Sequence, residues 1–357
     1  MVRKIALRLG KSYGERVIRL VKRHGLFDES FKIKHDEEFI LVPLKEKPSN
    51  ELLKIFEKNG ADIRIEDADF EKRRGKPMDL TESLKGKFAT DILCHLPRSI
   101  DIIGDIAVIE ISPEIEAHKR EIGKALLKIS KNINTVLVKA GPISTEYRVR
   151  DYEFTAGTRK TFTEHKEFGC RYFLDLTKAY FSPRLSFEHD RISSEVNERE
   201  VVVDMFAGVG PFSILIAKKV KKIKAYAIDI NPEAVKFLVK NIAINKVKRK
   251  VTAIYGDARE VAGKHLQRVA DRLIMNLPSE SIKFIDVACK VLKANGGILH
   301  FYNFMDDSSS IDEKIKELNE GVARARANKK IKKIRYSRKV REIAPRKWQI
   351  VIDAEIF

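Results

Sequence analysis

The feature that most constrains the fold is a regular alternation of short apolar runs and helical segments after residue 200. Five runs have the length and β-branched content of buried strands, and a segment with helical spacing follows each of them. The runs are 201–203, 225–228, 251–254, 272–275 and 297–302, and the helical segments are 211–220, 232–244, 258–266, 281–292 and 311–325. Repeated βα units of this kind predict a parallel sheet with helices on both faces.

The end of the chain narrows the choice among parallel-sheet folds. Two more strand-like segments, 331–343 and 348–357, follow each other with no helix between them. Five parallel strands closed by a hairpin is the class I methyltransferase arrangement, whereas a dinucleotide-binding fold would continue with βα units. We therefore expect an α/β protein with a class I, Rossmann-like methyltransferase domain at 181–357, built on a mainly parallel seven-stranded sheet.

Two smaller α+β domains are expected to precede this domain. Residues 1–68 contain two helical segments and a short apolar strand, and the polar stretch that follows is broken by Gly75 and Pro77. We predict a linker at 69–90. Further strand-like runs and one helix then predict a middle domain at 91–180 with a mixed sheet.

A turn rich in small residues follows the first strand of the C-terminal domain. The sequence Asp-Met-Phe-Ala-Gly-Val-Gly occupies 204–210, and small residues here let backbone N–H groups approach a ligand at the carboxyl end of the sheet. A tight β–α turn without a ligand is the alternative. The third glycine of the dinucleotide fingerprint would fall at Ser213, and Asp204 would repel a pyrophosphate. The acid suits the ammonium and sulfonium groups of S-adenosyl-L-methionine instead.

Polar residues also end the next three strands. Asp229 lies about 20 residues after the glycines, where an acid accepts hydrogen bonds from ribose hydroxyls. Asp257 could bind the adenine amino group, with the backbone of Ala258 facing the ring, and Asn276 ends the fourth strand. Each of these residues alone could be a helix N-cap. Because all four strands end in a polar group at one sheet edge, we favour a cofactor site.

Several motifs resemble the archaeal and eukaryotic family of tRNA (guanine-37-N1)-methyltransferases. Two lie in the cofactor domain, Asp-Met-Phe-Ala-Gly-Val-Gly-Pro-Phe-Ser at 204–213 and Asn-Leu-Pro at 276–278. Three precede it, Tyr-Arg-Val-Arg at 147–150, His-Lys at 165–166 and Tyr-Phe-Ser-Pro-Arg at 180–184. The resemblance implies a small N-terminal domain that reads the tRNA elbow, a middle domain, and methylation of N1 of the guanosine 3′ of the anticodon.

The resemblance also implies roles for individual residues. Guanine N1 carries a proton at neutral pH, so a base must remove it while a donor stabilises the charge on O6. The family pattern implies Glu188 as this base and Arg148 as the O6 donor. Tyr180 and Pro278 would contact the target base, and Asn276 would hold the base or the methionine end of the cofactor. Cofactor contacts are expected at His189, Asp204, Phe206, Asp229, Ile230, Asp257, Ala258 and Asn276.

One position departs from the family pattern. Many relatives have arginine after the glutamate, and this chain has His189. An imidazole can donate to the cofactor carboxylate but lacks a fixed positive charge.

Other functions stay open at this point. The related aminocarboxypropyl transferase of the wyosine pathway shares the fold and the cofactor, and a non-catalytic RNA-binding protein could keep a methyltransferase fold. A cytosine-C5 methyltransferase is disfavoured because its cysteine nucleophile should lie near the strand-four loop, where this chain has Ser279. A nicotinamide oxidoreductase is disfavoured by the missing third glycine.

Charge and composition suggest the partner and the compartment. The formal net charge is +19, and 324–347 holds twelve Lys and Arg against one Glu. This imbalance favours a polyanionic partner, which we expect to be tRNA. The histidines show no metal-ligand spacing, and the three cysteines lie far apart, so we expect no metal site. We further expect no membrane span or signal peptide, a cytoplasmic location and a monomer.

Overall fold

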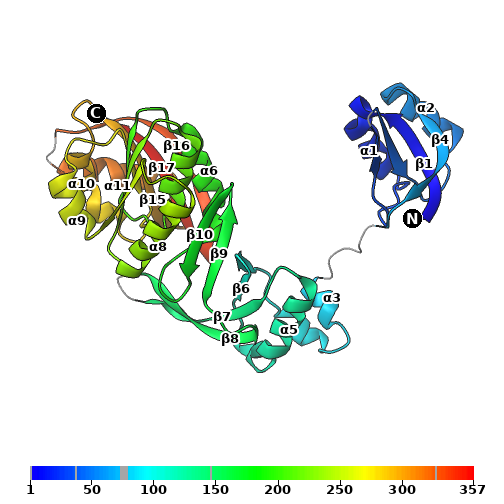
Figure 1. The fold of residues 1–357 in the computed structure, drawn as a ribbon, viewed down its shortest axis with the longest axis horizontal. Coiled ribbons are helices and arrows are strands. Elements are labelled where there is room, and N and C mark those ends of the chain that lie inside the picture. The colour runs from blue at the N-terminus through cyan, green and yellow to red at the C-terminus, as the bar shows by residue number, and fades with distance from the viewer. Residues whose placement is uncertain (1, 37, 73–78, 145–146, 326–327) are drawn as a thin grey trace. The chain divides into compact units, whose positions relative to one another are not determined.

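The computed structural model describes residues 2–36, 38–72, 79–144, 147–325 and 328–357, and these form two compact units, Met1–Ser83 and Leu84–Phe357 (Figure 1). Residues 73–78 of the expected linker lie outside the described residues, as do residues 145–146 of the middle domain. Each unit is described by itself.

The first unit is an antiparallel sheet covered by two helices. The sheet has the order β2-β3-β1-β4, with β1 at Val2–Gly10, β2 at Lys34–His35, β3 at Phe39–Pro43 and β4 at Arg64–Phe70. Helix α1 (Gly14–Arg23) and helix α2 (Asn50–Asn59) bury Val17, Val21 and Phe56 against it. The last strand runs two residues past the boundary expected at 68, and α3 (Leu80–Leu84) lies inside the stretch expected to be a linker.

The second unit begins with a mixed sheet of order β5-β6-β7-β8. Its strands are β5 (Asp101–Ile103), β6 (Ile106–Ile109), β7 (Thr135–Ser144) and β8 (Val149–Gly157), and only the β6–β7 pair among them is parallel. The short helix α4 (Thr90–Cys94) precedes them, and α5 (Lys119–Ile129) packs its buried face on β7 and β8.

A hairpin of β9 (Phe162–Glu167) and β10 (Cys170–Asp175) then packs on the C-terminal sheet domain. Asn241 lies in α8 (Pro232–Ile244) and Asn245 caps its C-terminal end, and their side-chain amides bond to backbone groups of Phe173 and Arg171 on β10. Cys170 lies in the same apolar core as the domain's first strands. The hairpin thus belongs, by its packing, with the C-terminal part of the chain.

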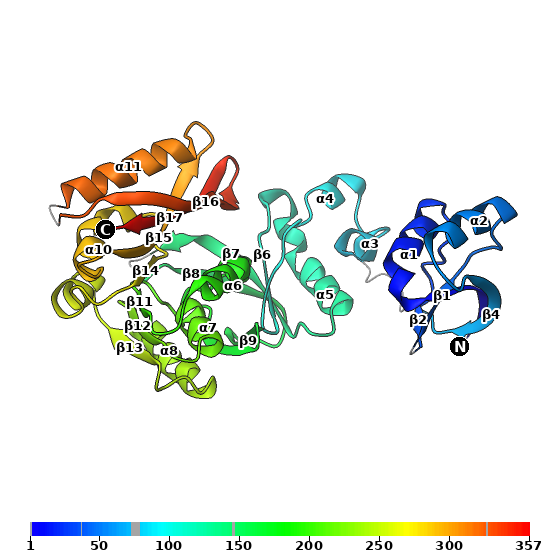
Figure 2. The same cartoon turned by 90° about the horizontal axis from the view of Figure 1, so that it is seen from above.

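The large sheet formed by the described residues has the order β13-β12-β11-β14-β15-β17-β16. Strands β11 (Val201–Asp204), β12 (Lys224–Asp229), β13 (Val251–Tyr255), β14 (Arg272–Met275) and β15 (Gly297–Asp306) are parallel. The closing strands β16 (Ile331–Ala344) and β17 (Lys347–Ile356) are antiparallel, and Figure 2 shows α11 (Ile311–Arg324) lying along them. These strands agree closely with the five runs and the hairpin expected from the sequence.

Helices cover both faces of this sheet and divide its core in two. Helices α6 (Ser186–Glu195), α7 (Pro211–Lys219) and α8 pack on one face, and α10 (Ile285–Val291) and α11 pack on the other. The helix expected at 258–266 is a short α9 (Ala258–Glu260) continued by a π-helical turn, and the helix expected at 281–292 opens with a 3₁₀ turn. Among the described residues, no helix has the length and apolar character needed to cross a bilayer.

Candidate cofactor and target-base site

A cavity of about 500 Å³ opens where the parallel strands of the large sheet end. Phe206 follows β11, Asp229 ends β12, Asp257 follows β13 and Asn276 follows β14. The parallel direction of these strands gathers their polar ends at one edge, as their order in the sequence predicts. The expected cofactor residues in the lining are Phe206, Asp229, Ile230, Asp257, Ala258 and Asn276.

Asp229 organises the turn that follows β11. Its carboxylate accepts backbone N–H groups from Gly208 at 2.6 Å and from Asn231 at 2.8 Å. Burial raises the pKa of Asp229 above its ordinary value, although both hydrogen bonds lower it. Each carboxylate oxygen has a second lone pair, so the side chain can still accept hydroxyl groups from a ligand.

The wall around Asp229 and Asp257 is largely apolar. Phe206 meets Phe284 edge to face, with ring centroids 5.0 Å apart, and both line the cavity beside Ile230 and Ala258. Asp257 also caps α9, because its carboxylate accepts the backbone N–H of Arg259 at 2.7 Å. Flat apolar walls with two carboxylates at the rim suit a nucleoside, whose ring stacks while its hydroxyl and amino groups donate.

The lining of the same cavity also includes the residues expected to meet a target base. Arg148, Tyr180, Asn276 and Pro278 all line it. The guanidinium carbon of Arg148 lies 5.5 Å from the centroid of the Tyr180 ring, and burial lowers the pKa of Arg148. Burial raises the pKa of the Tyr180 phenol, but the positive charge and hydrogen bond of Arg341 outweigh this effect and lower it. One cavity thus holds both groups of predicted residues.

Asp204 does not lie where the sequence suggested. The described lining of the cavity does not include it, because the side chain is fully buried beneath the turn and accepts the Ser213 hydroxyl at 2.9 Å. Within the described part of the chain, its Oδ1 atom has no hydrogen-bond partner. Burial raises the pKa of Asp204 to about 7. The sequence predicted that Asp204 contacts the cofactor directly, but the structure places this residue beneath the site instead.

Glu188 is likewise outside the described lining. It is fully buried in α6, where its carboxylate accepts hydrogen bonds from Arg191 and from the Tyr302 hydroxyl at 2.8 Å each. Arg338 of β16 forms an ion pair with its other oxygen at 3.0 Å. The helix turns this side chain toward the sheet, so the sequence motif indicated the residue but not its direction.

His189, the next residue, also points away from the cavity. Its Nδ1 atom lies 2.7 Å from a carboxylate oxygen of Glu167, and its ring meets Phe212 edge to face. Burial raises the pKa of Glu167, but hydrogen bonds to His165 and His189 lower it to about 2. The expected contact between His189 and a cofactor carboxylate is thus not present in this arrangement.

The lining also contains residues that the sequence did not single out as site residues, and among these Glu280, Arg341 and Gln349 carry charged or amide groups. Glu280 follows the Asn-Leu-Pro motif closely. Arg341 and Gln349 come from the closing hairpin, where they are paired across β16 and β17. Gln349 offered one signal, because it is an amide directly before the apolar run 350–352.

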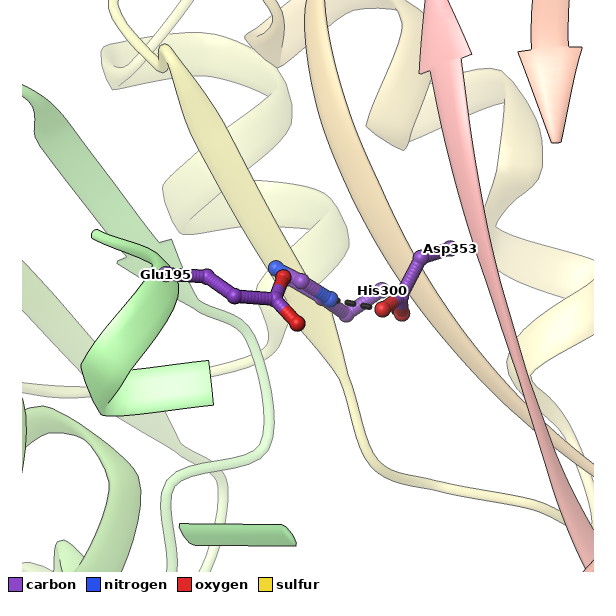
Figure 3. A group of neighbouring side chains, drawn as sticks. All are labelled: Glu195, His300 and Asp353. Atoms are coloured by element: carbon purple, nitrogen blue, oxygen red, sulfur yellow. Dashed lines mark hydrogen bonds and ion pairs between the residues drawn. The ribbon is translucent and has the colours of Figure 1, made fainter. Parts of the chain in front are cut away.

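A second polar cluster lies outside the described lining of the cavity and surrounds His300, for which the sequence showed no partner. Figure 3 shows Glu195, His300 and Asp353, whose possible ligand atoms lie within 4.8 Å of one another. The antiparallel register of β15 and β17 pairs His300 with Asp353, whose oxygen lies 2.6 Å from Nδ1. Arg272 approaches the other ring nitrogen at 2.8 Å, which takes the lone pair that a metal would need. We interpret this cluster as an ion-pair network in which His300 and Asp353 are buried and Glu195 is exposed.

The fold and the cavity together define a class I methyltransferase. The carboxylates of Asp229 and Asp257 at the strand ends and the apolar walls beside them fit the nucleoside part of S-adenosylmethionine. Family models agree with this class: residues 163–332 match the TRM5/TYW2 methyltransferase domain, 80–161 the TYW2 N-terminal domain, and 6–52 the tRNA methyltransferase 5 N-terminal domain.

Similarity to a full-length relative identifies the family within this class. It is 38% identical over 357 residues to the tRNA (guanine(37)-N(1))-methyltransferase Trm5b of Pyrococcus abyssi, covering 99% of each chain. The chain belongs to the TRM5/TYW2 family of methyltransferases.

Solved structures of relatives show the same fold. A structure titled as the complex of aTrm5 and tRNALeu has a TM-score of 0.67 and 34% identity, covering 98% of this chain and 99% of that one. The structure of Methanocaldococcus jannaschii TYW2 in complex with AdoMet has a TM-score of 0.56 and 30% identity, covering 72% of this chain and 99% of that one.

Proposed function

We propose that this chain is an enzyme that transfers the methyl group of S-adenosylmethionine to N1 of the guanosine 3′ of the tRNA anticodon. The observation that carries the proposal is a single cavity that joins two sets of residues. Strand-end acids and apolar walls suit the cofactor, and Arg148, Tyr180 and Pro278 suit a purine beside it.

On the cofactor side, Asp229 would hold the ribose and Asp257 the adenine. Asp229 is fixed by the backbone N–H groups of Gly208 and Asn231, so its remaining lone pairs have a defined direction. Phe206, Ile230 and Ala258 supply the apolar surfaces for the adenine ring. When bound, the cofactor supplies an electrophilic methyl group on its sulfonium sulfur.

On the base side, Arg148 would donate to guanine O6. A guanidinium keeps its charge in a buried site and stabilises the negative charge that grows on O6 as N1 loses its proton. Pro278 and Tyr180 would hold the ring, and Asn276 would complete the polar edge. These contacts orient N1, which lets a weak nucleophile attack in line.

The proton of N1 needs an acceptor, and Glu188 is our prediction for it. In the described arrangement its carboxylate is engaged by Arg191, Arg338 and Tyr302. Glu188 can take the proton only after the ion pair with Arg338 opens, which a polyanion bound at the basic strand β16 would favour by competing for the arginine. Glu280 is the carboxylate of the Asn-Leu-Pro loop that already faces the cavity, so it is the alternative acceptor.

The length of the match favours methyl transfer over aminocarboxypropyl transfer. The methyltransferase Trm5b relative covers 99% of this chain, and residues 6–52 match a tRNA methyltransferase 5 N-terminal domain. The TYW2 structure covers only 72% of it. A non-catalytic RNA-binding role is disfavoured because the acids of the cofactor pocket are intact.

Further proposals concern the whole chain. We propose that tRNA is the partner, that 1–68 contacts its elbow, and that 91–180 and 181–357 form the middle and catalytic domains, with the β9–β10 hairpin of the first range packed on the second. We also propose that the protein is located in the cytoplasm and is a monomer.

Two differently labelled cofactors test the proposed reaction. The protein is incubated with tRNA transcripts that carry G or A at the position 3′ of the anticodon, and with cofactor labelled either in the methyl carbon or in the carboxyl carbon. We expect label in the G transcript from the methyl-labelled cofactor alone. Label from the carboxyl carbon would identify an aminocarboxypropyl transferase, and no label at all would exclude both transfers.

A further inference from the structure

A chain of hydrogen bonds runs from the closing hairpin to the rim of the cavity. Arg341 on β16, Gln349 on β17 and Asn276 after β14 all line the cavity, although Gln349 lies 73 positions beyond Asn276 in the sequence. The β16–β17 register places Arg341 directly opposite Gln349. Gln349 is 1% exposed, so protein groups rather than bulk water decide its partners.

The direction of this chain is fixed by chemistry. A guanidinium can only donate hydrogen bonds, whereas each amide has one donor end and one acceptor end. Nε of Arg341 donates to Oε1 of Gln349 at 2.8 Å, so the other end of the Gln349 amide must be its NH₂ group. That group donates to Oδ1 of Asn276 at 3.1 Å. Asn276 is therefore left with its own NH₂ group as the polar group to offer to a ligand.

Arg341 is itself held on its remaining nitrogens. Nη2 donates to the Tyr180 hydroxyl at 2.9 Å, and Nη1 donates to the Ser182 hydroxyl. Tyr180 and Ser182 both lie in the segment before α6, and this segment holds the guanidinium in place. The guanidinium in turn orients Gln349, which lies on a different segment, β17. Because all three guanidinium nitrogens of Arg341 donate hydrogen bonds, the side chain is held in place. The Gln349 amide therefore cannot exchange its oxygen and its NH₂ group without losing the bond from Arg341.

We propose that Arg341 and Gln349 are positioning residues that hold the Asn276 amide with its NH₂ group toward the target base. The inference rests on the proposed function and deepens it. Together with Arg148 in the same lining, the Asn276 amide would then present donors to the base, which match a purine carbonyl and oppose a purine amino group. The relay thus contributes to the choice of guanine over adenine.

Reversing the Asn276 amide tests the relay. In Gln349→Glu the new carboxylate accepts from Arg341 as before, but it cannot donate, so Asn276 must turn its NH₂ group to that carboxylate and its oxygen to the base. We expect kcat for the G transcript to fall by about 10²-fold, the usual effect of losing one aligned donor. KM for the cofactor should change less than threefold. Gln267→Glu makes the same chemical change at an exposed position and should leave both constants unaltered.

A double-mutant cycle separates positioning from a general packing defect. In an Asn276→Ala background, Gln349→Glu should change kcat by less than threefold, because the residue through which it acts is gone. Arg341→Lys, which keeps the charge but loses the fixed fork, should lower kcat more in the wild-type background than in Asn276→Ala, where its contact with Tyr180 remains to act through. Additive losses in both backgrounds, or a wild-type kcat for Gln349→Glu, would overturn the relay. If the wild-type protein itself leaves the G transcript unmethylated, the proposed function fails, and the relay fails with it.

Discussion

At the scale of single residues, the surroundings of a carboxylate decide whether it can bind a ligand or only stabilises the fold. Asp229 lines the cavity and is held by backbone N–H groups, so it can bind a ligand. Asp204 is buried below the turn with one unpartnered oxygen among the described residues, and Glu188 is surrounded by donors. The sequence identifies acids at the ends of strands and in motifs. It cannot tell which way each side chain points, because that depends on packing between distant segments.

The titration of Asp204 should make the free energy of unfolding depend on pH. Burial raises the pKa of this carboxyl from 3.8 to about 7, so the folded state keeps the proton over a range where the unfolded state has lost it. The contribution of Asp204 to the free energy of unfolding should therefore fall as pH rises from about 4 to 7. Asp204→Asn removes this titration, so its stability relative to the wild type should grow by roughly 1–3 kcal/mol between about pH 5 and 8. Urea unfolding at several pH values measures it, and a difference independent of pH would contradict the assignment.

Replacing Glu188 tests the proposed proton acceptor. Glu188→Gln should slow single-turnover methyl transfer by about 10²-fold or more, the scale of general-base catalysis, with little change in cofactor affinity. Glu195→Gln is the matched control, because it lies on the same helix and also pairs with Arg191 but is exposed. It should retain a rate within threefold of wild type.

The opposite pattern would assign the proton to another residue. If Glu188→Gln reacts at a near-normal rate while Glu280→Gln is slowed about 10²-fold, the acceptor is the carboxylate that faces the cavity in the described arrangement.

At the scale of elements, the turn between β11 and α7 positions the cofactor site. Gly208 and Gly210 have φ values of +55° and +91°, which side chains other than glycine adopt only with strain. A Cβ atom at Gly210 would clash with Cδ1 of Leu238 on α8. The glycine therefore lets the turn and the neighbouring helix pack in contact, and it keeps Gly208 in reach of Asp229.

Substitution of Gly210 by alanine tests whether the turn needs a glycine at this position. Gly210→Ala combines an unfavourable φ with a clash against Leu238, so we expect a loss of about 2–4 kcal/mol in stability and weaker cofactor binding. Gly321→Ala is the control, because a Cβ there meets ordinary contacts in the helix α11 and should be neutral or slightly stabilising. Thermal unfolding and calorimetric titration measure both effects. Equal stability of the two variants would contradict the account of the turn.

Elements were predictable from the sequence to different degrees. The parallel strands were predictable because each contains a short apolar run, and Asn231 and Ser310 mark the starts of α8 and α11 as N-caps. The π-helical turn after α9 was not, since it reflects packing on α10 rather than local propensity. The pairings across the closing strands, such as that of Arg341 with Gln349, depend on strand register, which residue spacing alone does not reveal.

At the scale of the whole molecule, the charge and the cavity point to one kind of reaction. The formal charge of +19 suits a polyanionic substrate, and the strand β16 carries much of the basic excess while it supplies Arg341 to the cavity. The same strand would therefore meet the nucleic acid and complete the base site. This coupling gives a physical reason why chemistry should begin only when tRNA is in place.

Identification of the modified nucleoside tests this account most directly. The wild-type protein is incubated with tRNA and S-adenosylmethionine, and the product is digested and analysed by mass spectrometry, with its position mapped by reverse transcription. The account predicts 1-methylguanosine at the nucleotide 3′ of the anticodon. A methyl group on another atom or another nucleotide, or an aminocarboxypropyl adduct, would contradict it.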